Sequence, residues 1–300
     1  MQVLEKKMYE LENDEKKKPL EKFGYWIGKK LGKGGVIIPV VRLHGVIASD
    51  QKPNRINLQS VNPMLEKAFK MKKAPVVAIV INSPGGSPVQ SRLVANRIAQ
   101  LSIKHEKKVL VFIEDVAASG GYFIAVVGSE IFADPSSIVG SIGVVMGGFG
   151  FDEAIKKIGV SRRLYVSGKN KSTLDPFLPE KKTDVERIKK VGTEIHKTFI
   201  DYVKTHRGDK LKAKDDMLFT GEWWTGVSGL DLGLIDAIGD MHEVLRERYG
   251  DDVSLKIIEA KKSLFQIPSF GLSTGINANS IAGEAISAIE ERALWSRFGL

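Results

Sequence analysis

Continuous apolar runs alternate with helical patterns through the first half of the chain. Val36–Leu43, Pro75–Asn82 and Lys108–Glu114 are rich in β-branched residues, and their apolar positions are continuous rather than alternating. Such runs are typical of strands that are buried on both faces of a sheet. Between them, Leu58–Met71 and Val89–His105 have the spacing of amphipathic helices. The order strand, helix, strand, helix, strand predicts βαβ units and an α/β fold with a parallel sheet.

The pattern continues beyond the third strand. An apolar helix is expected after Ser119, followed by further strands and helices. The predicted elements are, in order, a strand at Glu130–Ala133, a helix at Phe151–Ile158, a strand at Arg162–Ser167 and a long amphipathic helix at Asp184–His206.

The two ends of the chain differ in composition from its middle. Residues 1–34 mix acids with lysines and predict a charged N-terminal arm, with a segment lying on anionic lipid as the alternative. Residues 35–250 carry the strand and helix patterns and predict one domain. Within residues 251–300, Ser263–Ser280 indicates a linker. Ile281–Phe298 has the spacing of an amphipathic helix that docks on its own domain or on a neighbouring subunit.

Composition excludes several kinds of site and partner. The chain has no cysteine, which excludes a cysteine nucleophile, a thiolate metal site and disulfides. A surplus of 45 Lys+Arg over 36 Asp+Glu gives a net charge of +9, but the basic residues are scattered, so no nucleic-acid partner is expected. No apolar stretch reaches the roughly 18 residues of a membrane span, and no signal peptide is apparent. We therefore expect a cytoplasmic or peripherally membrane-associated protein.

A first glycine-rich turn, Asn82–Ser87, follows the second predicted strand. Gly85 and Gly86 let the backbone approach a ligand closely, and N–H groups at the start of the next helix suit a phosphate or an oxyanion. No Gly-Lys-Ser/Thr follows, so the turn is not a phosphate-binding P-loop. An ordinary strand-to-helix turn explains the same residues equally well.

A second turn, Val116–Tyr122, sets Ser119 before two glycines. This resembles a nucleophile elbow, but Ala117 replaces the first glycine of G-x-S-x-G, so an α/β-hydrolase is not supported. A helix N-cap serine is the structural alternative. A catalytic Ser119 needs a base, and composition singles out no lysine. Of the five histidines, His44 follows a strand in a plausible core setting, and those on predicted helices look solvent-facing.

Five segments carry recognisable motifs: Asn82–Ser87, Ala118–Tyr122, Gly140–Gly143, Ser167–Lys171 and Gly221–Gly239. Together these segments resemble the protease IV, or signal peptide peptidase A, family of serine peptidases. The order and spacing of these motifs over Val36–Arg248 carry the resemblance. It implies a Clp protease/crotonase-like spiral of ββα units with a single catalytic domain, and a Ser–Lys dyad that needs no metal or cofactor.

The resemblance also assigns site residues position by position. Ser119 is the expected nucleophile and Lys171 the expected general base, with Lys169 as the neighbouring candidate. The oxyanion-binding N–H groups fall on Gly86 and Gly120, and the residue that orients the lysine amine is Ser141.

The function implied by the resemblance is a serine endopeptidase that cleaves membrane-derived or unfolded peptides, such as signal-peptide remnants. One catalytic unit per chain implies a homo-oligomer, and peripheral contact with an anionic membrane stays open. A crotonase-like acyl-CoA hydratase or isomerase is one alternative, with Glu114 and Asp115 as its acidic residues. A non-catalytic oligomeric scaffold is another, although it would need neither Ser119 nor Lys171.

Overall fold

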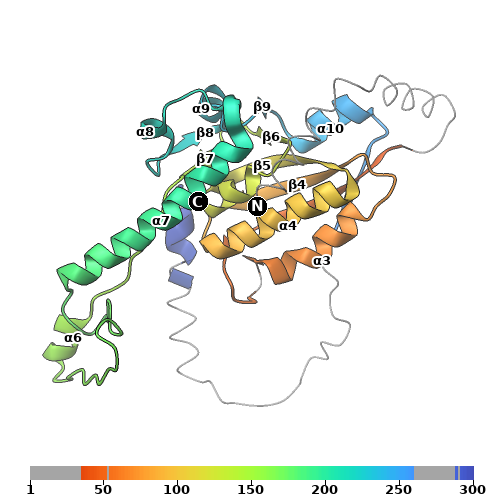
Figure 1. Cartoon of the computed structure of the whole chain (residues 1–300). Helices are drawn as coiled ribbons and strands as arrows, with labels where there is room; N and C mark the ends of the chain where they lie inside the picture. Colours follow the sequence, from red (N-terminus) through yellow and green to blue (C-terminus); the bar gives the residue numbers. More distant parts are fainter. Residues whose placement is uncertain (1–34, 53, 260–287, 290) are drawn as a thin grey trace, which may run out of the picture.

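A largely parallel β-sheet forms the centre of the protein in the computed structural model, which describes residues 35–52, 54–259, 288–289 and 291–300 (Figure 1). Every pairing along the main path of the sheet is parallel. The strands along this path are, in spatial order, β10 (Ser254–Ile257), β1 (Ile37–His44), β4 (Val76–Ser83), β5 (Lys108–Ala118), β6 (Glu130–Ala133) and β9 (Ala237–Ile238).

Two more strands join the sheet at the carboxyl end of β5, and a separate pair lies apart from it. β7 (Ile138–Gly140) runs parallel to β5 beyond the end of β6, and β8 (Trp223–Thr225) is antiparallel to β7. β2 (Val46–Ile47) and β3 (Arg55–Ile56) form a short parallel pair of their own. Four of the predicted site residues lie around this carboxyl end, namely Gly86, Ser119, Gly120 and Ser141.

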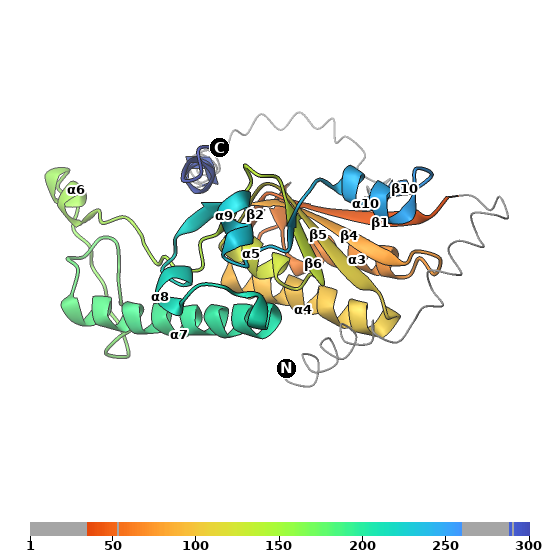
Figure 2. The same cartoon turned by 90° about the horizontal axis from the view of Figure 1, so that it is seen from above.

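Helices cover both faces of the sheet (Figure 2). α3 (Leu58–Phe69), α4 (Pro88–His105) and α5 (Gly120–Ala125) pack on one face, where Val41 and Leu43 of β1 point into the larger core. α10 (Met241–Tyr249) lies on the opposite face, over Ile38 and Val40. β4 is buried along its whole length because helices cover it on both sides.

α7 (Lys182–Arg207) belongs to the core only at its C-terminal end. There Phe123 of α5 packs on Phe199 and Tyr202, with ring centroids 5.1 and 4.1 Å apart. The N-terminal half of α7 projects away from the sheet, and α6 (Asp152–Lys157) lies near its outer end (Figures 1 and 2). A 3₁₀ turn at Gly208–Lys210, α8 (Asp215–Leu218) and α9 (Gly226–Asp231) follow α7.

The predicted α/β class with a parallel sheet is confirmed, and the predicted strands and helices before residue 134 match observed elements closely. The strand predicted at Arg162–Ser167 is wrong: these residues form no strand and are all exposed, because no neighbouring strand pairs with them in the described chain. The sheet also takes in β10, beyond the predicted domain end at residue 250. The predicted N-terminal arm, the predicted linker and most of the predicted C-terminal helix lie outside the described residues.

Candidate active site

Ser119 stands at the junction between β5 and α5, in a backbone conformation that is rare for a residue with a side chain. Its φ is 51° and its ψ is −119°. The Ser119 N–H donates to the Gly140 carbonyl oxygen at 2.8 Å, which fixes the residue against β7. Its hydroxyl makes no capping hydrogen bond to α5, so the N-cap alternative lacks the contact that defines it. Strained positions of this kind persist where the surrounding structure imposes them, and they concentrate at functional sites.

The glycine turn after β4 comes close to Ser119. A Cβ on Gly85 would lie 2.8 Å from the Cβ of Ser119, so only a glycine allows this approach. The Ile47 N–H donates to the Gly85 carbonyl and the Ser87 N–H to the Ile47 carbonyl, both at 2.8 Å. The Gly86 N–H points away from Ile47, because it belongs to the same trans peptide group as the Gly85 carbonyl, and the two point in opposite directions.

The Gly86 and Gly120 backbones meet at this point. A Cβ on Gly120 would lie 3.4 Å from the Gly86 nitrogen. Neither the Gly86 N–H nor the Gly120 N–H has an acceptor within the part of the chain that the structure describes. Gly86 is exposed, so a ligand can reach its N–H. The structure therefore brings together Ser119 and the two predicted donors, with α5 beginning behind them.

Ser141 lies on the other side of Ser119, at the end of β7. Ala118 pairs with Gly140, and Ser141 follows with a φ of 53° and a side chain that is buried. The Ser141 N–H donates to the Glu222 carbonyl at 2.6 Å, which ties this turn to the residues before β8.

His196 also contacts this turn, although it was expected to face solvent with the other histidines on predicted helices. Its Nε2 lies 2.9 Å from the Ile142 carbonyl oxygen, and its side chain is half-buried. Helical spacing could have placed His196 on the buried face of α7, because it lies three and seven residues before the buried Phe199 and Val203. His44, expected in a core setting, is instead exposed, with its ring stacked on Trp295 at 5.8 Å.

The structure does not bring Lys171 to Ser119. Lys171 and Lys169 are exposed in the segment between α6 and α7, and the Lys171 N–H donates to the Gly168 carbonyl at 3.0 Å within a local turn. Figures 1 and 2 both draw this segment at the outer end of α7, away from the start of α5. One protomer therefore holds the predicted nucleophile and oxyanion donors together and the predicted base apart.

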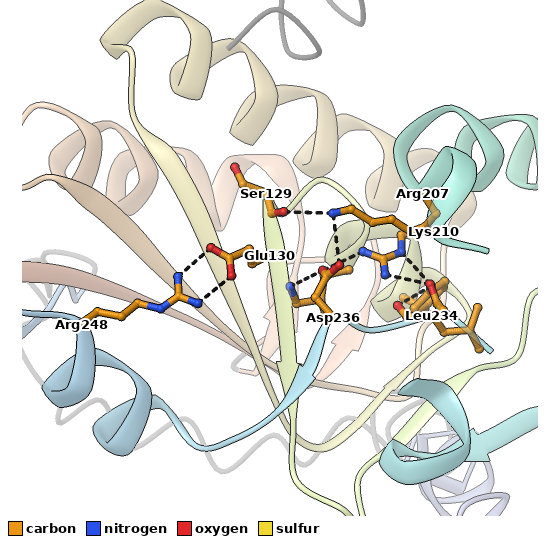
Figure 3. Close-up of polar contacts among 10 residues, drawn as sticks. Ser129, Glu130, Arg207, Lys210, Leu234, Asp236 and Arg248 are labelled. Atoms are coloured by element: carbon orange, nitrogen blue, oxygen red, sulfur yellow. Dashed lines mark hydrogen bonds and ion pairs between the residues drawn. The ribbon is translucent and has the colours of Figure 1, made fainter. Parts of the chain in front are cut away.

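A buried polar network links α5 to the C-terminal end of α7, and Figure 3 shows its members Arg207, Leu234 and Asp236. The Tyr122 hydroxyl donates to the Leu234 carbonyl at 2.8 Å, and burial raises the pKa of Tyr122. The adjacent Gly233 carbonyl accepts two hydrogen bonds from the buried Arg207 guanidinium, at 3.0 and 2.7 Å. Arg207 also donates to Asp236 at 2.8 Å. These contacts join the helix that follows Ser119 to the C-terminal end of α7.

Asp236 is the acidic member of that network. Burial alone would raise the pKa of its carboxyl, but the Arg207 hydrogen bond and charge, helped by Lys210, hold the pKa below its usual range. The Ile131 N–H donates to the same carboxylate at 2.8 Å. Glu130 and Arg248 form a separate and more exposed pair between β6 and α10 (Figure 3).

Comparison with known proteins assigns the chain to a family. The family model "Peptidase family S49" matches residues 102–252, about half of the chain. The chain is 54% identical over 272 residues to a protein named "Na(+)/H(+) antiporter NhaA" from Brucella abortus (strain 2308), which covers 88% of this chain but only 37% of that protein. The chain thus spans little more than a third of this relative's length.

A shorter relative is matched over most of its length. "Putative protease slr0021" of Synechocystis sp. (strain ATCC 27184 / PCC 6803 / Kazusa) is 31% identical over 66% of this chain and 73% of its own. Among solved structures, a mutant of the "1510-N membrane-bound stomatin-specific protease" has a TM-score of 0.48 and 16% identity, over 76% of this chain and 99% of that one. The family match and the shorter relative agree with the predicted resemblance: this chain belongs to peptidase family S49.

Proposed function

We propose that the chain is a serine endopeptidase in which Ser119 is the nucleophile. The observation that carries the proposal is the close approach of the Gly86 and Gly120 backbones beside Ser119, which has a strained backbone and an uncapped hydroxyl. Neither glycine N–H has an acceptor in the described ranges. Two fixed donors at one point suit the oxygen of a tetrahedral intermediate, whose negative charge develops only during reaction. Family membership supports the same reaction class.

In this mechanism the Ser119 oxygen attacks the carbonyl carbon of the scissile peptide bond and its proton passes to a neutral lysine amine. The carbonyl oxygen becomes an oxyanion that accepts hydrogen bonds from the Gly86 and Gly120 N–H groups. The lysine then gives its proton to the leaving amine as the C–N bond breaks, which produces an acyl-enzyme. Water, deprotonated by the same lysine, hydrolyses that ester and frees Ser119.

We further propose that the base is Lys171 and that a second copy of the chain supplies it. Residues 145–181, which include α6 and carry Lys171, expose large apolar side chains to a degree unusual for a monomer. Val145, Phe149, Ile158 and Tyr165 are 77%, 65%, 74% and 92% exposed. Docking of this segment against a neighbouring copy would cover these side chains and carry Lys171 towards that copy's Ser119. Ser141, beside Ser119 in the sheet, would then orient the arriving amine by its hydroxyl.

The proposed substrates are unfolded or membrane-derived peptides with apolar side chains, such as signal-peptide remnants. An apolar surface next to Ser119, formed by Val116, Ala118 and Ile138, supports this class. The chain's own Trp295 and Phe298 pack on this surface, so it accommodates large apolar groups. Burial of such groups is the main source of affinity for an unfolded peptide.

We also propose a cytoplasmic or peripherally membrane-associated location. No helix within the described ranges is both long and apolar enough to cross a bilayer. The net charge of +9 favours contact with anionic lipid over contact with neutral lipid. Sedimentation with vesicles of phosphatidylserine and of phosphatidylcholine alone tests the membrane contact, and equal sedimentation with both would contradict the preference for anionic lipid.

The main test is intact-mass analysis after incubation with a fluorophosphonate probe, combined with cleavage of a fluorogenic apolar peptide. We expect one adduct on the wild-type chain and none on Ser119→Ala or Lys171→Ala. The variant Lys169→Ala is the matched control and should react like the wild type. A folded wild-type chain that takes no adduct and cleaves no peptide would overturn the proposal.

A further inference from the structure

The alignment between the oxyanion turn and the nucleophile depends on an irregularity in β5. Ile81 of β4 pairs with Ile113 of β5, but Ser83 pairs with Ala117. One residue of β4, Asn82, therefore stands opposite three residues of β5, Glu114, Asp115 and Val116. Such an insertion is a β-bulge, and bulges beside active sites re-aim the residues that follow them.

The bulge decides which residue faces the glycine turn. With two more residues in β5 than in β4, Gly85 comes level with Ser119, and a Cβ on Gly85 would lie 2.8 Å from that of Ser119. In a regular pairing Gly85 would face Ala117, and Ser119 would lie about 7 Å further along the strand, at about 3.3 Å per residue. The oxyanion donors and the nucleophile would then no longer meet.

A side chain from β4 holds the inserted residues on one side. The Asn82 Nδ2 donates to the Asp115 carboxylate at 2.5 Å. Asn82 is 5% exposed, and its Oδ1 is buried without a hydrogen-bond partner in the described chain. Burying an amide with an unpaired oxygen is destabilising, so hydrogen bonding alone does not explain an asparagine here.

Ser137 holds the inserted residues on the other side of β5. β5 changes partner at the bulge, since Ile113 pairs with β6 whereas Val116 pairs with β7. The Ser137 hydroxyl donates to the Glu114 carbonyl at 2.5 Å and lies 3.3 Å from the Ile113 carbonyl. Ser137 is 2% exposed, so this contact is sheltered from water. Both edges of the bulge are thus tied by buried side chains.

Resting on the proposed function, we infer that Asn82, Asp115 and Ser137 are positioning residues that clamp the β5 bulge and hold Ser119 in register with Gly86. None of them needs to touch substrate. Asp115 acts through Asn82 on the oxyanion turn, and Ser137 acts on the change of partner from β6 to β7, where Gly140 receives the Ser119 N–H. The carboxylate considered for acyl-CoA chemistry thus has a structural partner.

Asp115→Ala tests the clamp, because Asp115 is exposed and its replacement removes no apolar side chain from the core. We expect kcat and the phosphonate labelling rate to fall about 10- to 100-fold with KM within about twofold, since misplaced oxyanion donors weaken only the transition state. Asp115→Asn keeps an acceptor for Asn82 and should stay within about threefold of the wild type. Glu114→Ala is the matched control, because Glu114 lies in the same bulge but pairs with Arg42.

Hydrogen exchange provides a readout that does not require activity. Asp115→Ala should speed amide exchange in residues 83–91 and 114–123, while Glu114→Ala leaves both segments at the wild-type rate and all variants remain folded under the assay conditions. If Asp115→Ala matches Glu114→Ala in both labelling and exchange, the clamp is wrong. If the wild type itself is unlabelled, the proposed function is wrong, and the exchange difference alone decides the clamp.

Discussion

The two halves of the proposed dyad lie in regions of very different construction. Ser119 follows a fully buried stretch of β5, and the adjoining Gly120 and Tyr122 are buried as well. Lys171 lies in a segment that is largely exposed and whose hydrogen bonds are mostly local. The first, rigid region is fixed by the sheet. The second, the projecting segment of residues 145–181, extends away from the sheet beside α7 (Figure 1).

This difference indicates that a single chain would preform the proposed oxyanion site but would not place the proposed base. An oxyanion site works because its donors are held in place before charge develops, so it belongs in the rigid region. A general base can arrive on a separate element, provided that binding buries its amine and keeps it neutral. The exposed apolar side chains around Lys171 fit a segment whose packing partner is another copy.

Removing the nucleophile gives the largest expected effect in the rigid region. Ser119→Ala should lower peptide cleavage by about 10⁴-fold or more, as loss of a catalytic serine does elsewhere. The measurement is turnover of an apolar peptide together with adduct mass. Because alanine removes only a hydroxyl from a half-buried residue, thermal unfolding should stay near that of the wild type. Residual turnover close to the wild-type rate would place the nucleophile elsewhere.

The corresponding change in the projecting segment is Lys171→Ala. We expect a loss of about 10³-fold in kcat, since general-base catalysis contributes about 10² to 10⁴. Lys169→Ala, two positions away and equally exposed, should change kcat by less than about threefold. A larger loss of kcat in Lys169→Ala than in Lys171→Ala would identify Lys169 as the base. The comparison of the two regions would then still hold.

Breaking the network behind α5 should affect stability more than any change in the projecting segment. Asp236→Asn leaves the buried Arg207 guanidinium without its anion, and we expect the free energy of unfolding to fall by about 3 kcal/mol. Glu130→Gln, which breaks the more exposed pair with Arg248, should cost less than about 1 kcal/mol. Urea unfolding measures both, and equal losses would contradict the role given to the buried pair.

The smallest effect is a pH dependence that differs between the regions. The folded pKa of Asp236 is held below its unfolded value, so the unfolded chain binds more protons and stability rises with pH. This contribution is complete above the unfolded pKa of about 3.9 and is lost as pH falls through the folded value. Asp236→Asn should therefore flatten the decline in unfolding temperature below about pH 4.

Asp175 is the control for this pH dependence. It lies in the projecting segment, where the Phe177 N–H and the Arg162 guanidinium lower the pKa of its carboxyl. Because its hydrogen-bond partners, Arg162 and Phe177, lie in the same segment, its titration should act only locally, and Asp175→Asn should leave the acid decline unchanged. A flatter decline in Asp175→Asn would show that the projecting segment contributes to global stability.

Much of the rigid region could be predicted from the sequence. Continuous apolar runs identified β1, β4 and β5, and the two glycine turns identified where the strands end. Gly86, Gly120 and Ser119 come together because neighbouring parallel strands end at the same edge of the sheet. The residue types alone did not separate an oxyanion site from an ordinary turn, and it was the family resemblance that favoured the oxyanion site proposed above.

Other features depend on long-range contacts that local patterns do not encode. The β5 bulge appears only when Asn82 and Asp115 are seen side by side, 33 positions apart in sequence. β7 and β8 are three residues long, too short for a strand pattern to stand out. The strand predicted at Arg162–Ser167 failed for the opposite reason, because a suitable local pattern found no pairing strand.

The most direct test of the account is complementation between two inactive chains. Ser119→Ala and Lys171→Ala, co-expressed with different affinity tags and purified through both, would form mixed assemblies. If a second copy supplies the lysine, about a quarter of the sites in a random assembly should regain activity, and the phosphonate should label only the Lys171→Ala chain. Mixed assemblies that remain as inactive as either variant alone, while assemblies of wild type with either variant stay active, would contradict the account.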